Sequence, residues 1–577
     1  MKILLVHPED DPLRGAWVSH AWDRVIDLGR ASPGSYERWS QFFACDAVPL
    51  EMLRREDFRT MRTIVASGFG AVVDREGLDW WELNSMIFHQ QLETVIALGN
   101  FADQLGSQNE LFVTRPGFHV DALRSLTGGA VRCFSNQLRE RKRRFQRYLQ
   151  IWSKFPLPQI VEILGDKYDP SFSIRRMFAP KKNSCRRPVV LLPSAYGNVS
   201  RTGIAYANTQ PETQFLLVAT RRSGRVRNPP ANVAAADLAS YASRGPESGV
   251  ESGLLAGKWR RLRERLRSIR EVELLARLGV LDSFPRLLRH GLEIRDAWRT
   301  VFEREPIRAV LCADDTNPYT HIPLLLARTR NIPAIACHHG ALDGRHLFKR
   351  NHADVILAKG RMEEDYLVRV CGVPGDLVEV GAPVRATSDR AARADNGSSS
   401  SIVFFSEPYE IFGARAAEFY RDIVPPLAGL AAQTGKRLII KLHPAESLRE
   451  RERMVSKILP HEERAFQIVS GPLNDELLAN TWFGVTVCST VAIECSLFGV
   501  PCFVCQWLDY WHYGYIEQFA RFGVGRVLKS AAQIGEIPRL VESVGTQETR
   551  DLWRRIDRER LQNLFNGERA IAHALAI

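Results

Sequence analysis

A cation and an imidazole lie two residues apart in "RLIIKLHPAE" (437–446), where an apolar run of the chain ends. If that run is a strand, its period of two puts Lys441 and His443 on one face, and Pro444 stops the ladder. Ligands of parallel α/β sheets bind outside the carboxyl ends of the strands. These two side chains could therefore hold a phosphate through charge-assisted hydrogen bonds. A histidine packed at a strand–loop corner is the alternative.

A second stretch, "VTVCSTVAIECSLFGVPCFV" (485–504), places hydroxyls where another apolar run passes into a helix. The side chains of Ser489 and Thr490, with the free N–H groups of a helix start, form an anion site. Glu494 follows them by five and four residues, whereas a capping box requires a spacing of three. Its carboxylate is therefore available to accept hydrogen bonds from ligand hydroxyls. Plain N-capping by Ser489 is compatible with this interpretation.

Two aspartates and a histidine are candidates for acid–base chemistry. Asp314 and Asp315 end the apolar run "IRAVLCADD", and His339 precedes Gly340 at the end of "IPAIACHHG". Transfer to an acceptor hydroxyl needs a base that takes its proton. Either Asp315 or His339 could be that base, or Asp315 could orient His339. Asp315 as a helix cap and His339 as a packed histidine are the alternatives.

Two α/β units are needed to position these residues. Short apolar runs alternate with helical patterns along the second half of the chain, which is typical of parallel sheets covered on both faces. The first unit has predicted strands at 187–193, 214–220, 307–315, 332–340, 353–360 and 376–383. The second has them at 402–407, 437–444, 466–471, 483–489 and 500–505.

The expected fold class is therefore α/β, with two Rossmann-like domains facing a cleft and an extended N-terminal region. A Ser-rich segment reads as a linker at 391–401, between domains at 181–390 and 402–577. Residues 1–180 form an α/β region whose boundary stays open. Within it, strands are predicted at 2–7, 70–74 and 110–117 and a helix at 89–105.

The composition of the 577 residues, 45% hydrophobic and 25% charged, is that of an ordinary globular protein. No apolar run approaches the ~18–20 residues of a membrane span, and the opening "MKILLVHPEDD" fits a first strand better than a signal peptide. The 10 cysteines have no framework spacing, as expected of a cytoplasmic protein with reduced thiols. The pattern of residues indicates no metal site.

The net charge of +12 favours anionic partners. Basic residues concentrate at 138–147 and 258–270. A solvated helix face is the plain interpretation of both stretches, and a peripheral contact with an anionic membrane is the functional one. Nucleic acid is disfavoured because no recognition motif accompanies them. The expected location is cytoplasmic, with peripheral attachment at the inner membrane face as an option.

The motifs "KLHP" and "STVAIECSLFGVP" resemble those of GT-B-fold glycosyltransferases of the bacterial surface-polysaccharide group. That group includes capsule-type, sialyl- and Kdo-type transferases with HP and Ser-Ser/Thr motifs, and the CDP-glycerol glycerophosphotransferases. The resemblance covers about 305–505. It implies that His443, Ser489 and Thr490 contact the phosphate of a nucleotide donor and that Glu494 holds donor hydroxyls.

The same resemblance implies an acceptor side. "ADDT" is similar to the Asp/Glu-Asp/Glu-Gly motif of bacterial sialyltransferases, in which an acid is the general base, although Thr316 stands here in place of the glycine. The "HG" motif implies that His339 lies at the acceptor, beside Gly340. GT-B enzymes generally use helix dipoles and basic residues instead of a metal. No cofactor is therefore expected, and a nucleotide-sugar is the substrate.

These observations predict a metal-independent, inverting glycosyltransferase that moves a sugar from a nucleotide-sugar donor to a surface-polysaccharide or lipid-linked acceptor. The alternatives are a CDP-polyol phosphotransferase on the same fold, a UDP-sugar 2-epimerase and a non-catalytic basic scaffold. Catalytic roles are predicted for Asp315, His339 and His443, donor binding for Lys441, His443, Ser489, Thr490 and Glu494, and acceptor-side positions for Asp314 and Gly340.

Overall fold

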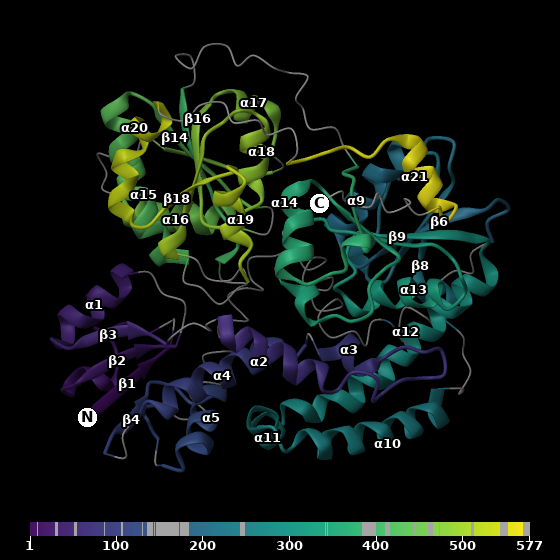
Figure 1. Ribbon diagram of the computed structural model, residues 1–577. Helices are drawn as coiled ribbons and strands as arrows, with labels where there is room; N and C mark the ends of the chain where they lie inside the picture. Colours follow the sequence, from purple (N-terminus) through teal and green to yellow (C-terminus); the bar gives the residue numbers. More distant parts are fainter. Residues whose placement is uncertain are drawn as a thin grey trace, which may run out of the picture. The chain divides into compact units, whose positions relative to one another are not determined.

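Figure 1 shows the protein as a computed structural model. The residues that it describes are 1–7, 10–28, 33–50, 55–85, 87–105, 108–129, 131–135, 184–242, 248–340, 342, 344–383, 400–409, 416–443, 446–459, 466–471, 473–508, 513–542 and 552–568, with the single residues 142, 145 and 172.

The chain divides into two compact units, and each unit takes segments from distant parts of the sequence. Unit 1 comprises Met1–Met52, Ala97–Arg141 and Ala386–Trp553. Unit 2 comprises Leu53–Ile96, Lys142–Arg385 and Arg554–Ile577. Unit 1 contains an N-terminal and a C-terminal sheet, and unit 2 contains the central sheet. The predicted α/β class is confirmed, with parallel sheets in separate units.

The N-terminal sheet has five parallel strands in the order β3-β2-β1-β4-β5. An aromatic core that includes Trp17, Trp22, Trp39 and Phe112 packs against its central strands. The bounds are β1 (Lys2–Val6), β2 (Arg24–Asp27), β3 (Asp46–Pro49), β4 (Glu110–Val113) and β5 (Arg132–Cys133), with helices α1 (Pro33–Phe43) and α5 (Phe118–Thr127).

The central sheet has seven parallel strands in the order β12-β11-β10-β9-β6-β7-β8. Most of its inner strands are buried along their whole length, as runs such as "FLLVA" and "AIAC" require, and β9 is buried from its third residue on. The strands are β6 (Val189–Ser194), β7 (Phe215–Ala219), β8 (Val233–Asp237), β9 (Ile307–Cys312), β10 (Ala334–Cys337), β11 (Val355–Ala358) and β12 (Val378–Val380).

Helices from three parts of the chain surround the central sheet. Between its strands run α9 (Gly197–Asn208), α10 (Ser248–Leu266), α11 (Arg270–Arg277), α12 (Phe284–Arg304), α13 (Pro318–Arg328) and α14 (Arg361–Asp365). From the N-terminal part come α2 (Arg55–Ala66), α3 (Trp80–Ser85) and the start of α4 (His89–Asp103), and from the C-terminal end comes α21 (Arg558–Phe565).

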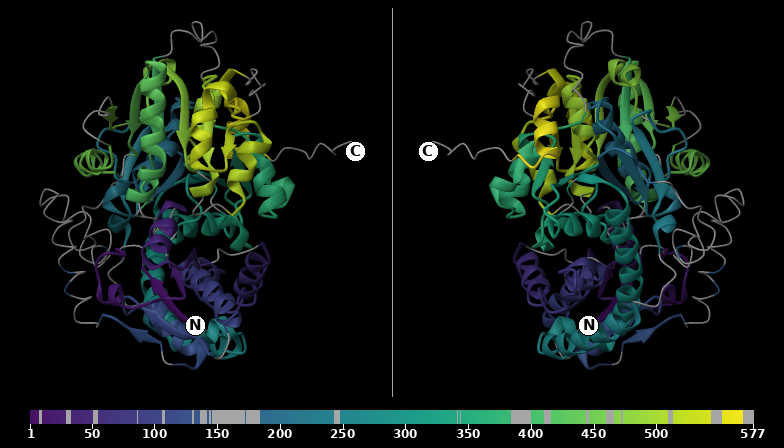
Figure 2. Two further views of the ribbon diagram at one scale, coloured as in Figure 1. Left: turned by 90° about the vertical axis from the view of Figure 1, so that its left-hand side faces the viewer. Right: turned by 90° about the vertical axis from the view of Figure 1, so that its right-hand side faces the viewer.

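The C-terminal sheet has six parallel strands in the order β15-β14-β13-β16-β17-β18, with helices on both faces (Figure 2). The strands are β13 (Ser401–Phe405), β14 (Arg437–Lys441), β15 (Phe466–Val469), β16 (Thr481–Thr486), β17 (Cys502–Cys505) and β18 (Arg526–Leu528). The helices are α15 (Ala416–Thr434), α16 (Leu448–Ile458), α17 (Asp475–Ala479), α18 (Val491–Leu497), α19 (Tyr515–Arg521) and α20 (Ile537–Glu542).

Each sheet reverses its strand order at one place. In each sheet, the second and third strands of the sequence are added on one side of the first strand. The fourth strand then pairs on the other side of that first strand. The switch points therefore lie between β1 and β4, between β6 and β9, and between β13 and β16. Open α/β sheets bind ligands outside the carboxyl ends of strands at such points. Each switch point is therefore a candidate ligand-binding site.

The structure divides the chain differently from the predicted domains. Residues 1–180 do not form one region, because 53–96 belong to unit 2. The range 402–577 extends too far, since Leu561, Leu564 and Phe565 of α21 are buried in the core of the central sheet. Most of the predicted linker, 391–399, lies outside the described residues.

One predicted strand in the N-terminal region is wrong. "GAVVD" (70–74) forms a turn, which a short bridge between Val73 and Asp79 closes. Gly70 has a φ of 76°, which suits glycine, and its N–H donates to the Asp79 carboxylate. The carboxylate of Asp74 forms a buried ion pair with Arg295 of α12. The apolar residues of this segment therefore belong to a loop and not to a strand of a sheet.

Candidate functional site

Three strand ends meet at the switch point of the central sheet. Tyr196 follows β6, Asp314 follows β9, and His339 follows β10. β9 pairs with both of its neighbours, and a bridge between Asp314 and His338 extends that pairing past the strand ends. The topology thus brings together residues that are up to 143 positions apart in the sequence.

Asp314, Tyr196 and His339 form a hydrogen-bonded cluster. The Tyr196 hydroxyl donates to Asp314 Oδ2 at 2.6 Å and lies 3.2 Å from His339 Nε2. Thr316 donates to Asp314 Oδ1 from its backbone N–H at 3.0 Å and from its hydroxyl at 2.5 Å. Burial alone would raise the pKa of Asp314, but His338, His339 and these hydrogen bonds outweigh it and lower the pKa to about 2. The carboxylate is therefore ionised and accepts hydrogen bonds only.

The surroundings of His339 suit a ring that takes up a proton. Its Nδ1 lies 3.3 Å from the carbonyl oxygen of Ala313, which can only accept, so the Nδ1–H tautomer leaves the Nε2 lone pair for a proton. Once Nε2 is protonated, it can donate to the Tyr196 oxygen, whose own proton is directed to Asp314. The half-buried imidazole could therefore accept a proton at Nε2, where the buried carboxylate of Asp314 would offset the positive charge.

Asp315 faces a different set of partners, which corrects its predicted role. Its carboxylate lies 3.0 Å from Lys349 Nζ and 3.7 Å from His346 Nε2, and all three side chains are buried. Burial raises the pKa of Asp315, but Lys349, His346 and His321 outweigh this and hold the pKa well below its usual range. A carboxylate held in this way is a poor base. Asp314, which the sequence predicted only as an acceptor-side residue, is the aspartate that is linked to His339, through the Tyr196 hydroxyl.

A second buried ion pair supports the loop that carries His339. Lys359 Nζ donates to Glu363 Oε1 and to the carbonyl oxygen of Gly340, both at 2.9 Å. The Gly340 N–H donates to His338 Nδ1 at 3.2 Å. Burial lowers the pKa of His338 well below its usual value, so this ring is neutral. A Cβ added at Gly340 would meet no atom within 4 Å, so this turn is open on the side where a side chain would be.

At the carboxyl end of β14 in unit 1, the predicted donor-binding residue Lys441 is engaged with backbone carbonyl groups. Its ammonium group is buried and donates to the carbonyl oxygens of Leu442, at 3.0 Å, and of Gly471. Burial lowers the pKa of Lys441, although Glu446 opposes the shift. The cation therefore satisfies backbone carbonyls at the strand end, which a phosphate ligand would have to displace.

His443 is held by a turn that sequence reasoning missed. Its N–H donates to Glu446 Oε2 at 2.8 Å, and the other carboxylate oxygen accepts from Ser406 at 2.8 Å and from Arg451 at 2.7 Å. Glu446 is 1% exposed at its side chain, and burial raises its pKa despite these partners. The His443 ring remains half-buried. Pro444, between them, lies outside the described residues.

Ser489 and Thr490 precede α18 at the carboxyl end of β16, as predicted. Ser489 Oγ accepts from the Val491 N–H at 3.3 Å, and Thr490 is the N-cap residue without a side-chain capping bond. Both are half-buried, and Glu494 is exposed one turn into the helix. The switch point beside them is closed by Glu407, whose carboxylate accepts from the Cys488 N–H and from Thr486.

The predicted residues thus fall into one group in each unit. In unit 2, Asp314, His339 and Gly340 lie together and Asp315 turns away. In unit 1, His443 and Ser489 follow β14 and β16, the two neighbours of β13, so the strands that carry them are roughly 10 Å apart. The residues missed are Tyr196, Glu446 and Glu407. Tyr196 and Glu407 carried a signal, because each stands in the first turn after a predicted strand, in "LPSAYG" (192–197) and "SEPYE" (406–410).

The described residues lack two kinds of feature. They contain no group of three or more His, Cys, Asp or Glu side chains that could hold a metal ion. None of their helices is long and apolar enough to cross a membrane.

Known proteins offer only distant likenesses. No protein-family description matches the chain, and no curated protein matches it. The UDP-GlcNAc 2-epimerase from Methanocaldococcus jannaschii is similar over 66% of this chain and 97% of its own, at 14% identity and a TM-score of 0.37. A variant of the wall teichoic acid polymerase TagF covers 72% and 98% at 12% identity and 0.38, and the calicheamicin glycosyltransferase CalG4 covers 67% and 96% at 12% and 0.37. These values are too low to assign a family or a reaction.

Proposed function

We propose that the protein is a GT-B-type glycosyltransferase that moves a sugar from a nucleotide-sugar donor to a surface-polysaccharide or lipid-linked acceptor, with inversion and without a metal. The observation that carries the proposal is the cluster of His339, Tyr196 and Asp314 at the switch point of the central sheet. The cluster combines an oriented imidazole, that of His339, with the buried carboxylate of Asp314. These are the groups needed to deprotonate a hydroxyl.

In this proposal His339 Nε2 takes the proton of the acceptor hydroxyl as its oxygen attacks the anomeric carbon. The bond from that carbon to the donor phosphate breaks, and the nucleotide leaves with the electron pair. His443 and the Ser489–Thr490 helix start stabilise the departing phosphate, since preorganised donors act where charge develops. Glu494 accepts hydrogen bonds from donor hydroxyls. Asp315 and Lys441 stabilise the conformation of the chain at the ends of β9 and β14 and do not contact the substrate.

A donor-binding measurement tests the unit 1 half of the proposal. Ligand that binds only the folded state raises the melting temperature, so CMP, CDP, UDP and GDP are each added to wild type, to His443→Ala and to His20→Ala. The last removes an exposed imidazole of the same unit. One nucleotide should stabilise wild type and the His20 variant and not the His443 variant. No stabilisation by any nucleotide would contradict the proposal.

Product analysis distinguishes the reactions that share this fold. A nucleotide-sugar that matches the base found above is incubated with and without a glycan acceptor. A glycosyltransferase releases the donor's nucleotide (CMP from a CMP-sugar, a nucleoside diphosphate from the others) in an acceptor-dependent reaction that His339→Ala abolishes. Isomerised donor sugar without acceptor would indicate the 2-epimerase, and release of CMP from a CDP-polyol would indicate the phosphotransferase.

A further inference from the structure

The inward face of α10 is fully used in packing within unit 2. Leu255, Trp259, Leu262 and Leu266 are buried, and the Trp259 ring stacks on Phe284 of α12 with centroids 4.1 Å apart. Glu251, at the start of the helix, accepts two hydrogen bonds of 2.8 Å from the buried guanidinium of Arg295. The helix is therefore firmly seated, and its opposite face has a fixed direction.

That outer face carries two aliphatic side chains that are mostly exposed. Val250 is 81% exposed and Leu254 is 67% exposed. Positions four residues apart lie on the same face of a helix, one turn from each other. In the described part of the chain, no other two large hydrophobic side chains exposed to this degree lie one turn apart on one helix.

Positive charge continues the same face towards the C-terminal end of α10. Arg261 follows Val250 by eleven residues, three helical turns, and Arg260 lies beside it; both are exposed. Neither has an acidic partner among the residues that the structure describes. Glu264 is also exposed here, but it pairs with Arg267 at 3.4 Å. Arg265 donates to the carbonyl oxygen of Ser67, which leaves its charge unbalanced.

We infer that the outer face of α10 docks on an anionic lipid bilayer. Val250 and Leu254 would enter the boundary between headgroups and acyl chains, and Arg260, Arg261 and Arg265 would contact lipid phosphates. Interfacial helices combine these two features, because insertion of apolar side chains and attraction to anionic lipid add together. An RNA backbone would attract the arginines equally, but it gives two exposed aliphatic side chains nothing to bury against. The inference does not depend on the reaction that the protein catalyses.

The experiment measures sedimentation of the full-length protein with two kinds of vesicle. One is phosphatidylcholine alone, and the other contains added phosphatidylglycerol. Wild type should bind the anionic vesicles. The double change Val250→Ser, Leu254→Ser and the double change Arg260→Gln, Arg261→Gln should each weaken that binding at least about tenfold, since each basic residue near such a surface contributes about fivefold. Binding should also weaken as salt is added.

Matched variants elsewhere keep the test specific. Leu13→Ser removes an aliphatic side chain that is 66% exposed in unit 1, and Arg449→Gln with Arg453→Gln removes two exposed arginines from α16. Both should bind like wild type, and all variants should melt at the wild-type temperature because the altered side chains are on the surface. Equal binding to both vesicle types, equal losses in the controls, or binding to RNA without binding to anionic vesicles would overturn the inference.

Discussion

Adjacent aspartates at the end of β9 serve different purposes. Asp314 accepts from Tyr196 and Thr316 at the switch point, whereas Asp315 pairs with Lys349 in the interior. The chain turns directly after Asp314, so Asp314 faces Tyr196 and Asp315 faces Lys349 and His346. Both are 1% exposed, and only their partners distinguish a carboxylate that supports a base from one that anchors a loop.

The Tyr196 hydroxyl should matter to the chemistry more than to stability. Tyr196→Phe keeps the ring against His339 and removes the oxygen that would stabilise the imidazolium. We expect kcat to fall about tenfold to a hundredfold, less than the ~10²–10⁴-fold of a whole acid–base contribution, because His339 itself remains. The acidic limb of the pH–rate profile should move to lower pH, because the base is easier to deprotonate. Tyr206→Phe, which removes a buried hydroxyl bound to the Gly381 carbonyl, should leave the profile in place.

Lys349 should be essential to the fold because it balances the charge of Asp315. Lys349→Met leaves a buried carboxylate with too little positive charge near it, and we expect the free energy of unfolding to drop by about 3–5 kcal/mol. Denaturant titration measures this loss. Adding Asp315→Asn to Lys349→Met removes the orphaned charge and should recover part of the stability. A double variant no better than Lys349→Met would show that the pair is not coupled.

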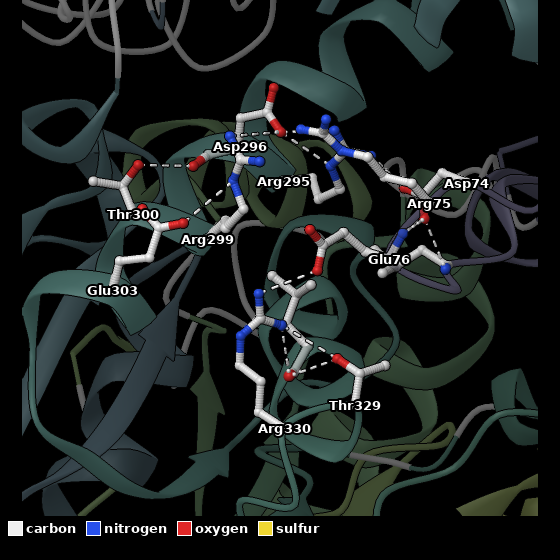
Figure 3. Close-up of polar contacts among 12 residues, drawn as sticks. Asp74, Arg75, Glu76, Arg295, Asp296, Arg299, Thr300, Glu303, Thr329 and Arg330 are labelled. Atoms are coloured by element: carbon white, nitrogen blue, oxygen red, sulfur yellow. Dashed lines mark hydrogen bonds and ion pairs between the residues drawn. The ribbon is translucent and has the colours of Figure 1, made fainter. Parts of the chain in front are cut away.

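At the scale of elements, the segment between α2 and α4, which belongs to unit 2, is bonded to α12, to the turn after α13 and to the loop after Lys349, and holds that loop in place. Arg295 of α12 bonds Asp74 at 2.8 Å, and Arg330 bonds Glu76 at 3.1 Å, which fixes the turn before α3 (Figure 3). On α3 itself, buried Glu82 accepts the N–H groups of Arg350 and Asn351 at 2.8 and 2.7 Å. Those residues follow Lys349 directly, so the N-terminal part of the chain holds the loop that anchors Asp315.

Glu82→Gln should loosen that loop. The amide presents an N–H₂ group where the carboxylate accepted from the Asn351 side chain at 2.6 Å, so we expect a loss of about 1–3 kcal/mol in unfolding free energy. Hydrogen exchange at the amides of Arg350 and Asn351 should become faster. Glu303→Gln on α12 alters an exposed pair with Arg299 and should cost less than about 0.5 kcal/mol. Unchanged hydrogen exchange in the Glu82 variant would show that Glu82 does not hold the loop at Arg350 and Asn351 in place.

At the scale of the molecule, each unit depends on chain segments that are remote in sequence. After Trp553 the chain enters unit 2, where the Ala382 N–H donates to the carbonyl oxygen of Arg554 and the Ala382 carbonyl oxygen accepts from the Ile556 N–H, in a short parallel bridge. Residues of α21 then complete the core of the central sheet. Neither unit corresponds to one continuous stretch of sequence, so an excised piece such as 181–390 would expose apolar surface that the full chain buries.

Acid should destabilise unit 2 through a buried histidine. Burial, with the charges of His346 and Lys349, lowers the pKa of His352 from 6.5 to about 4. A lowered folded-state pKa contributes stability that is present above the unfolded value and is lost as the pH falls from about 6.5 through 4. We expect this to cost up to about 3 kcal/mol, measured as melting temperature against pH. His352→Phe should flatten the decline, whereas His20→Asn, at an exposed position, should not.

The sequence by itself determined the elements and the class of fold. Apolar runs that end in Gly, Pro, Asp or His predicted most strands of the central and C-terminal sheets, because strand formation and strand ending depend on a few consecutive residues. The same patterns placed His339 and Ser489 at strand ends. The short N-terminal strands β2 and β3 escaped notice because they are four residues each and only partly apolar.

Only the tertiary structure decided which of these residues work together. Tyr196 meets Asp314 across 118 positions because the chain reverses its strand order between β6 and β9. Lys441 donates to two carbonyl oxygens, and Asp315 forms an ion pair with Lys349. A buried charge must be paired, and the neighbouring elements determine which partner is within reach. Such choices depend on contacts between distant segments, which local periodicity cannot encode.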